Sequence, residues 1–173
     1  MTRASDHRFR TAADDESSDA PRILSLPAAQ ATPLRDLLET VVAEVSAGTE
    51  AAPGRVRVTL DVPVGQVVDA DAGLFRSLVE GLVAAAFAAA DHPATDTDGP
   101  GVREVVVTSV DGGDSFELEI ADSGGLPADG RPLSGVRELA RRCGGDISVT
   151  GCPEGGTAVT IRLSRRLIGR QAA

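Results

Sequence analysis

Lysine, tryptophan and tyrosine are absent from the 173 residues, and only two cysteines, two histidines and one methionine occur. All 17 basic side chains are therefore arginines, and the aromatic side chains are four phenylalanines. The core must be built mainly from valine, leucine and alanine, because hydrophobic residues make up 42% of the chain. A chain of this length is expected to form one domain with polar tails.

The excess of acidic over basic residues and the lack of long apolar runs argue against nucleic acid and membrane as partners. The net charge of −9 repels a phosphate backbone, which argues against nucleic-acid binding. No run of 18 apolar residues occurs, since the longest, Leu82–Ala90, is short and mostly alanine. The N-terminal residues lack the apolar core of a signal peptide. The expectation is a cytoplasmic protein without a membrane partner.

Cysteine and histidine are too few and too scattered to indicate a metal centre. Cys143 and Cys152 lack the spacing of metal ligands, so we expect two reduced thiols, with a disulfide or redox pair as the alternative. His92 stands in a polar loop without a neighbouring ligand, and a solvated side chain is expected there. No metal-binding residue is assigned.

Two alternating runs in the second half of the chain predict a β-hairpin. Glu104–Val110 and Ser115–Ala121 alternate between apolar and polar residues, and a Gly-Gly turn joins them. The second run leads directly into Asp122-Ser123-Gly124-Gly125-Leu126-Pro127. A strand that ends in an aspartate and a glycine turn can place one carboxylate at the floor of a pocket.

The other predicted elements surround this hairpin. Thr32 and Asp71 are expected to cap helices that begin at Pro33 and Ala72, because polar caps precede helical apolar spacing. The remaining predictions are strands at Ile23–Leu26, Arg55–Val62, Val67–Asp69, Asp146–Thr150 and Thr157–Leu163, and a helix at Leu133–Cys143 that ends at Gly144.

Together, these segments resemble the histidine-kinase/gyrase-type ATPases, which share the Bergerat fold. Asp122 and Gly124 match the family's first glycine box, Val136-Arg137-Glu138-Leu139 with Gly144-Gly145 matches its last helix, and Gly156-Thr157 matches its closing hairpin. The resemblance implies an α/β (α+β) two-layer sandwich, with a mixed β-sheet and about three helices on one face. Residues 23–164 would form this domain, between a disordered tail at 1–22 and a basic tail at 165–173.

The resemblance also implies a nucleotide site of which only the adenine half remains. Asp122, Gly124, Gly125 and Thr157 would bind the nucleotide, with Asp122 accepting from the adenine amino group and Thr157 assisting, although the glycine turn is one residue shorter than in the family. The family's two asparagine positions, counted from Asp71, fall on Gly81 and Ala85, and an alanine cannot bind the family's Mg²⁺. Only about five residues stand in place of the second glycine box and the lid that close over the phosphates.

The function that follows is a degenerate histidine-kinase-like ATPase domain, which acts as a protein-binding or regulatory module in bacterial two-component signal transduction. No catalytic residue is assigned, and Mg²⁺ is not expected, whereas ATP, ADP or another purine remains a candidate ligand. A response regulator, a kinase or a sigma-factor regulator would be the partner.

Two alternatives remain open. The chain could be an ATP-binding histidine kinase or anti-sigma-factor-type kinase domain with a non-standard nucleotide site, in which Glu80 or Asp91 supplies a metal ligand. It could also be a metal-independent purine sensor. His7, in the segment His7–Thr11, faintly resembles a phosphoacceptor histidine but lacks the acidic residue that follows it in the family, so no role is assigned to it.

Overall fold

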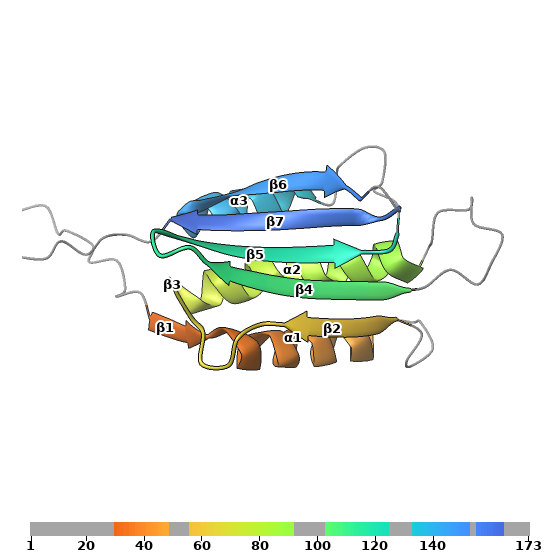
Figure 1. The fold of residues 1–173 in the computed structure, drawn as a ribbon, viewed down its shortest axis with the longest axis horizontal. Coiled ribbons are helices and arrows are strands. Elements are labelled where there is room, and N and C mark those ends of the chain that lie inside the picture. Colours follow the sequence, from red (N-terminus) through yellow and green to blue (C-terminus); the bar gives the residue numbers. More distant parts are fainter. Residues whose placement is uncertain (1–29, 49–55, 92–102, 125–132, 153–154, 165–173) are drawn as a thin grey trace, which may run out of the picture.

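The computed structural model describes residues 30–48, 56–91, 103–124, 133–152 and 155–164 (Figure 1). Three helices lie against one face of a five-stranded sheet of order β2-β4-β5-β7-β6. β2 is parallel to β4 and the other neighbours are antiparallel, which confirms the predicted mixed two-layer sandwich. The elements are β1 (Gln30–Pro33), α1 (Leu34–Gly48), β2 (Arg57–Asp61), β3 (Val67–Ala70), α2 (Ala72–Asp91), β4 (Glu104–Asp111), β5 (Ser115–Asp122), α3 (Ser134–Arg142), β6 (Gly145–Gly151) and β7 (Thr157–Ser164).

Helix α2 is the centre of the core. Its first turn is capped as predicted, because the Leu74 N–H donates to Asp71 Oδ1 at 2.8 Å. Its inner face carries Phe75 and Leu78, which are fully buried, and Phe75 packs edge-on against Phe116 of β5. At 20 residues and a mean hydropathy of 1.5, α2 meets the length and composition criteria for a membrane span. Of that apolar window, 39% is buried inside the described structure.

The start of α1 differs from the prediction. Thr32 and Pro33 belong to β1, which pairs antiparallel with β3, so the helix begins at Leu34 rather than Pro33. The reason is tertiary: Pro33 lies opposite Val67, and the Leu34 N–H donates to the Gln66 carbonyl at 3.0 Å, which keeps the chain extended to the helix start. The predicted strand Ile23–Leu26, both tails, His7 and His92 lie outside the described residues.

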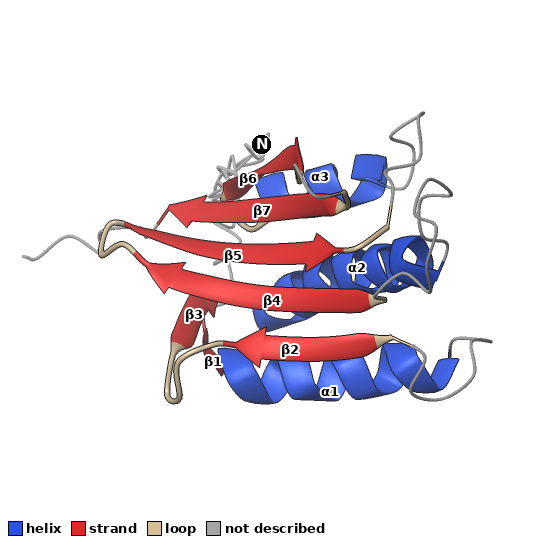
Figure 2. Cartoon of the chain, turned by 45° about the vertical axis from the view of Figure 1, so that its right-hand side comes forward, coloured by secondary structure: helices blue, strands red, loops and turns tan. Residues whose placement is uncertain are grey.

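The strand directions separate the two ends of the sheet. β5 ends beside the start of β7, since Asp122 is paired with Thr157. β2, β4 and β7 all end at the opposite end of the sheet, because β2 is parallel to β4 while β5 is antiparallel to both β4 and β7. The end that carries Asp122 is called here the aspartate end, and the other the hairpin end, since the β4–β5 turn lies there (Figure 2).

The two cysteines do not form a pair. Both are free thiols, and the whole of β6 separates them, which is about 20 Å for seven extended residues. Burial, followed by the nearby Asp71 carboxylate, raises the pKa of the Cys143 thiol. Two reduced thiols are therefore the correct expectation, and the disulfide alternative is wrong.

Candidate functional site

The carboxylate of Asp122 lies at the end of an apolar column. Alternate residues of β5 face the helices, so the buried series Phe116, Leu118 and Ile120 continues to Asp122 at the last position of the strand. Asp122 is 9% exposed, and its neighbour across the sheet, Thr157, is 2% exposed. The fold thus brings together two of the residues predicted to bind a purine.

The turn after Asp122 is held by hydrogen bonds on both sides. The Gly124 N–H donates to Asp122 Oδ1 at 2.9 Å, so the carboxylate caps its own turn. Ser123 extends the β4–β5 pairing, because its N–H donates to the Glu104 carbonyl at 3.0 Å and its hydroxyl accepts from the Glu104 N–H at 2.9 Å. Burial raises the pKa of Asp122 to about 6, against the opposing effect of the Gly124 N–H.

Two glycines permit close backbone contacts around Asp122. A Cβ atom at Gly124 would lie 2.0 Å from the carbonyl oxygen of Ala89, so the end of α2 rests on the glycine turn. A Cβ atom at Gly156 would lie 2.1 Å from the Asp122 carbonyl oxygen, and its φ of 96° also favours glycine. Both positions therefore require glycine for packing alone. The fourth predicted residue, Gly125, lies outside the described residues.

The two sides of α2 face different neighbours. Gly81 faces α3, because a Cβ atom built on Gly81 would lie 3.4 Å from Val136 Cγ2. Two turns further along α2, the Ala89 carbonyl packs against Gly124 in the glycine turn. Ala85 lies between these contacts, since residues four apart share a helix face. Arg76 forms an ion pair with Glu44 of α1, and Glu80 is one turn beyond Arg76. Glu80 therefore lies on the α1 side of α2, away from Ala85.

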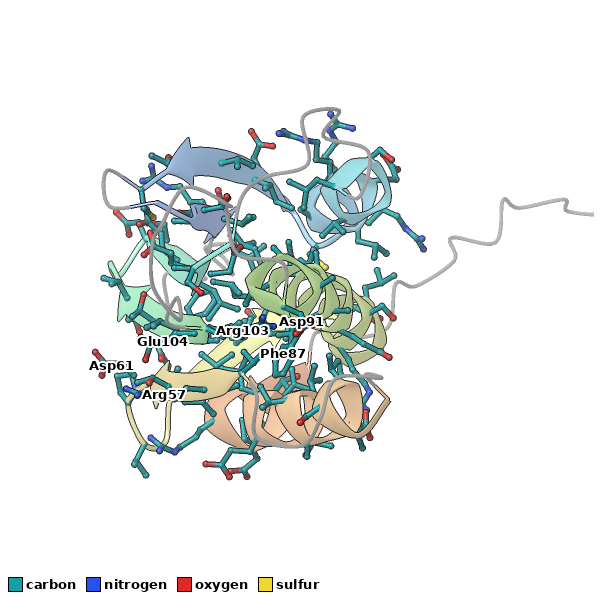
Figure 3. The ribbon with its side chains drawn as sticks, turned by 90° about the vertical axis from the view of Figure 1, so that its right-hand side faces the viewer. Arg57, Asp61, Phe87, Asp91, Arg103 and Glu104 are labelled. Atoms are coloured by element: carbon teal, nitrogen blue, oxygen red, sulfur yellow. The ribbon has the colours of Figure 1, made fainter. Side chains whose placement is uncertain are left out.

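An arginine that sequence reasoning overlooked fixes the far end of α2. The Arg103 guanidinium donates to the Asp91 carbonyl oxygen at 2.6 Å and to the Asp91 carboxylate at 2.5 Å (Figure 3). A cation at the C-terminus of a helix is favourable because the last carbonyls are unpaired and the helix dipole is negative there. No local pattern indicates this contact, since eleven residues separate the partners, most of them in a predicted loop.

Replacement of Arg103 by methionine should destabilise the domain by about 1–2 kcal/mol, because a partly buried, charge-assisted contact is lost. The control is Arg141→Met, which removes an exposed ion pair with Glu138 and should cost under about 0.5 kcal/mol. Urea denaturation of both variants measures the difference. Equal effects of the two substitutions would contradict a specific role for Arg103 at the end of α2.

The acidic residues of the site do not gather into a metal centre. Within the described ranges, no group of three or more His, Cys, Asp or Glu side chains is placed to hold a metal ion. Asp91 contacts Arg103, Glu80 is exposed one turn beyond Arg76, and Asp122 accepts a hydrogen bond from its own turn. The described geometry offers one buried carboxylate acceptor beside one threonine.

Solved structures with a similar fold include parts of histidine kinases. The histidine kinase AdeS of Acinetobacter baumannii is 15% identical over 78% of this chain and 66% of its own, with a TM-score of 0.61. The chain has the Bergerat fold of histidine kinase ATPase domains.

Two further structures extend this likeness. The ATP binding domain of PrrB from Mycobacterium tuberculosis is 19% identical, over 79% of this chain and 97% of its own, with a TM-score of 0.60. The cytoplasmic segment of the histidine kinase QseC is 18% identical, over 82% of each chain, with a TM-score of 0.55. No family model matches the sequence, and no curated protein matches it either. The Bergerat fold is therefore evident from the structure at a level of identity that carries the fold alone.

Proposed function

We propose that this chain is a histidine-kinase-like ATPase domain that acts as a protein-binding and regulatory module in bacterial signal transduction, without efficient ATP hydrolysis or phosphotransfer. The observation that carries the proposal is Ala85, on the side of α2 next to the glycine turn, where the family resemblance places the magnesium-binding asparagine. An alanine methyl offers no oxygen ligand. Phosphoryl transfer depends on a metal ion that neutralises the developing charge. Loss of the metal ligand is therefore expected to remove catalysis before it removes nucleotide binding.

The retained half of the site supports binding of a purine. The buried carboxylate of Asp122 can accept a hydrogen bond from an exocyclic amine, with Thr157 opposite it on β7. A hydrogen bond to a charged acceptor contributes about 1.5–3 kcal/mol, which is enough to select an amine over a carbonyl at that position. The proposed ligand is ATP, ADP or another purine, bound without Mg²⁺.

The partner proposed for the module is a signalling protein of the cytoplasm: a response regulator, a kinase or a sigma-factor regulator. The structural similarity to parts of the histidine kinases AdeS and QseC supports this class of partner. The similar part of QseC is its cytoplasmic segment. The excess of acidic side chains favours a partner with basic groups over nucleic acid.

The second candidate is an ATP-binding histidine kinase or anti-sigma-factor-type kinase domain with a non-standard nucleotide site. The observation in its favour is the buried Asp122 beside Thr157. A substitute metal ligand would be needed, however. Asp91 would have to leave Arg103, and Glu80 would have to reach across α2 from the α1 side.

Turnover of ATP separates the two candidates. Incubation of the chain with γ-labelled ATP and Mg²⁺ should give neither phosphate release above the blank nor labelled protein. Turnover that the Asp122→Asn substitution abolishes would overturn the proposal in favour of a kinase. Because that variant keeps the shape of the side chain and the bond from Gly124, its loss of activity could not be attributed to a disrupted turn.

Restoration of an amide at position 85 should introduce dependence on magnesium. In Ala85→Asn, we expect Mg²⁺ to raise the affinity for ADP about tenfold, equivalent to about 1.4 kcal/mol, because the asparagine oxygen supplies a ligand beside the phosphates. The matched control is Ala84→Asn, whose exposed side chain is rotated about 100° around the helix. Calorimetric titration measures both. An equal response of the two variants would remove Ala85 from the site.

A further inference from the structure

Strand β6 forms one edge of the five-stranded sheet. In the described part of the chain its one neighbour in the sheet is β7, and α3 packs behind it (Figure 1). The strand has seven residues, among them Ile147, Val149 and Thr150, whose side chains favour extended backbone. An edge of this length and composition can add a strand from another molecule, and native proteins commonly protect such edges.

The register shows which backbone groups of β6 point away from β7. The Cys152 N–H donates to the Gly156 carbonyl at 3.0 Å, so the backbone groups of residue 152 point toward β7. The two sides of a strand alternate from one residue to the next. Residues an odd number of positions before Cys152, among them Ile147 and Val149, therefore direct their N–H and C=O groups to the outer edge.

Side chains occupy both outward backbone groups of Ile147. Its N–H donates to Asp146 Oδ1 at 2.8 Å, and its carbonyl oxygen accepts from Arg137 Nη1 at 3.2 Å. Arg137 belongs to α3, so the donor comes from the helix that covers this edge. An incoming strand would have to displace both side chains before it could pair with Ile147.

A similar contact stands at the other edge of the sheet. The Arg57 N–H donates to the Arg103 carbonyl at 2.8 Å, so residue 57 points toward β4 and the even-numbered residues of β2 face the outer edge. Val62 continues that series directly after β2, and its carbonyl oxygen accepts from Arg35 Nη1 of α1 at 2.9 Å. At both edges, an arginine of the adjacent helix thus bonds an outward carbonyl.

We propose that Arg137 and Asp146 close the outer edge of β6 to strand addition, and thereby prevent this edge from pairing with the β6 edge of a second copy. Two β6 edges are self-complementary, because they can pair antiparallel about a twofold axis. Ile147 is the third of the seven residues, so its closure interrupts the row of outward groups within the strand. It lies about 13 Å along β6 from Gly151, the partner of Thr157, and acts independently of the proposed purine site.

Self-association of the double variant Arg137→Ala/Asp146→Ala tests this closure. The variant loses one positive and one negative charge, so its net charge stays at −9. Sedimentation across a range of concentrations should show dimers that form at least about tenfold more tightly than in the wild type, because the Ile147 groups become available. The matched control is Glu138→Ala/Arg141→Ala, which removes an exposed ion pair of α3 at the same net charge and should leave self-association unchanged.

A proline locates the contact between the copies. Val149→Pro removes an N–H that points to the outer edge and leaves the bonds to β7 in place. Added to the double variant, it should return self-association to the wild-type level. A double variant that associates no more than the wild type would overturn the closure, and so would a dimer that persists with the proline.

Hydrogen exchange of the Ile147 amide provides a second test in the single variant Asp146→Ala. This amide should exchange at least about tenfold faster in the variant than in the wild type, because its acceptor is removed. The Ile120 amide, in the central strand β5, serves as the control for an intact fold and should be unaffected. Equal exchange of Ile147 in both proteins would show that Asp146 does not occupy the edge.

Discussion

Asp122→Asn should make the domain more stable at pH 7.5, by about 1–3 kcal/mol. Burial raises the pKa of Asp122 from 3.8 to about 6, so the ionised carboxylate is held in the fold at a cost. The asparagine oxygen can still accept the bond from the Gly124 N–H and carries no charge. This cost supports the proposed role of Asp122 as a ligand, in addition to the turn that its carboxylate caps.

The pH dependence of this gain has a definite sign. The folded state binds the Asp122 proton more tightly than the unfolded state, so ionisation lowers stability as the pH rises from about 4 to about 6. The advantage of Asp122→Asn should therefore be near zero at about pH 3 and complete above about pH 7. Urea denaturation of variant and wild type across this range measures it. Asp114→Asn, in the exposed hairpin turn, is the control, with an expected effect under about 0.5 kcal/mol. A destabilised Asp122→Asn at pH 7.5 would contradict the burial cost.

Gly124→Ala should cost more than about 3 kcal/mol and lower the yield of soluble protein. The new methyl group would lie 2.0 Å from the Ala89 carbonyl oxygen and 2.2 Å from its carbon, and these backbone atoms cannot yield without moving the end of α2. Thermal and urea denaturation measure the loss.

A matched glycine isolates the packing effect. Gly135→Ala stands in α3 with open space around the new methyl group, and it should raise stability by up to about 1 kcal/mol, because alanine is the better helix former. A loss below about 1 kcal/mol in Gly124→Ala would contradict the close approach of α2 to the glycine turn. The glycine therefore has a structural role that is separate from any nucleotide.

The sequence predicts the elements that local patterns specify. The alternation in β4 and β5, the cap at Asp71 and the glycine after α3 each act over a few residues, and all three are found. β1 was not predicted, because its four residues lack alternation and contain Pro33. β3 fixes that strand, since its residues pair with β1 across more than thirty positions of sequence.

In the candidate site, too, some features could be predicted from the sequence and others could not. The resemblance pointed to Asp122 and Thr157, and the structure places them opposite each other. The contact of Gly124 with Ala89 and the bond of Arg103 to Asp91 depend on how distant segments pack. No spacing in the sequence encodes these two features, so they come from the structure alone.

The two halves of the site give the domain its proposed character. A buried carboxylate is kept at a cost in stability, while the α2 position expected to bind Mg²⁺ is an alanine. Such a site favours recognition of a purine over chemistry on its phosphates.

Calorimetric titration with ATP, ADP and adenosine, each with and without Mg²⁺, tests the central claim most directly. The account predicts that the three ligands bind with affinities that Mg²⁺ changes less than about twofold, or about 0.4 kcal/mol, and that Asp122→Asn abolishes binding. Affinity for ATP that rises tenfold or more with Mg²⁺ would contradict the loss of the metal site and would favour the alternative of an ATP-binding kinase domain. Absence of binding by all three ligands would contradict the purine site and leave the protein-binding role.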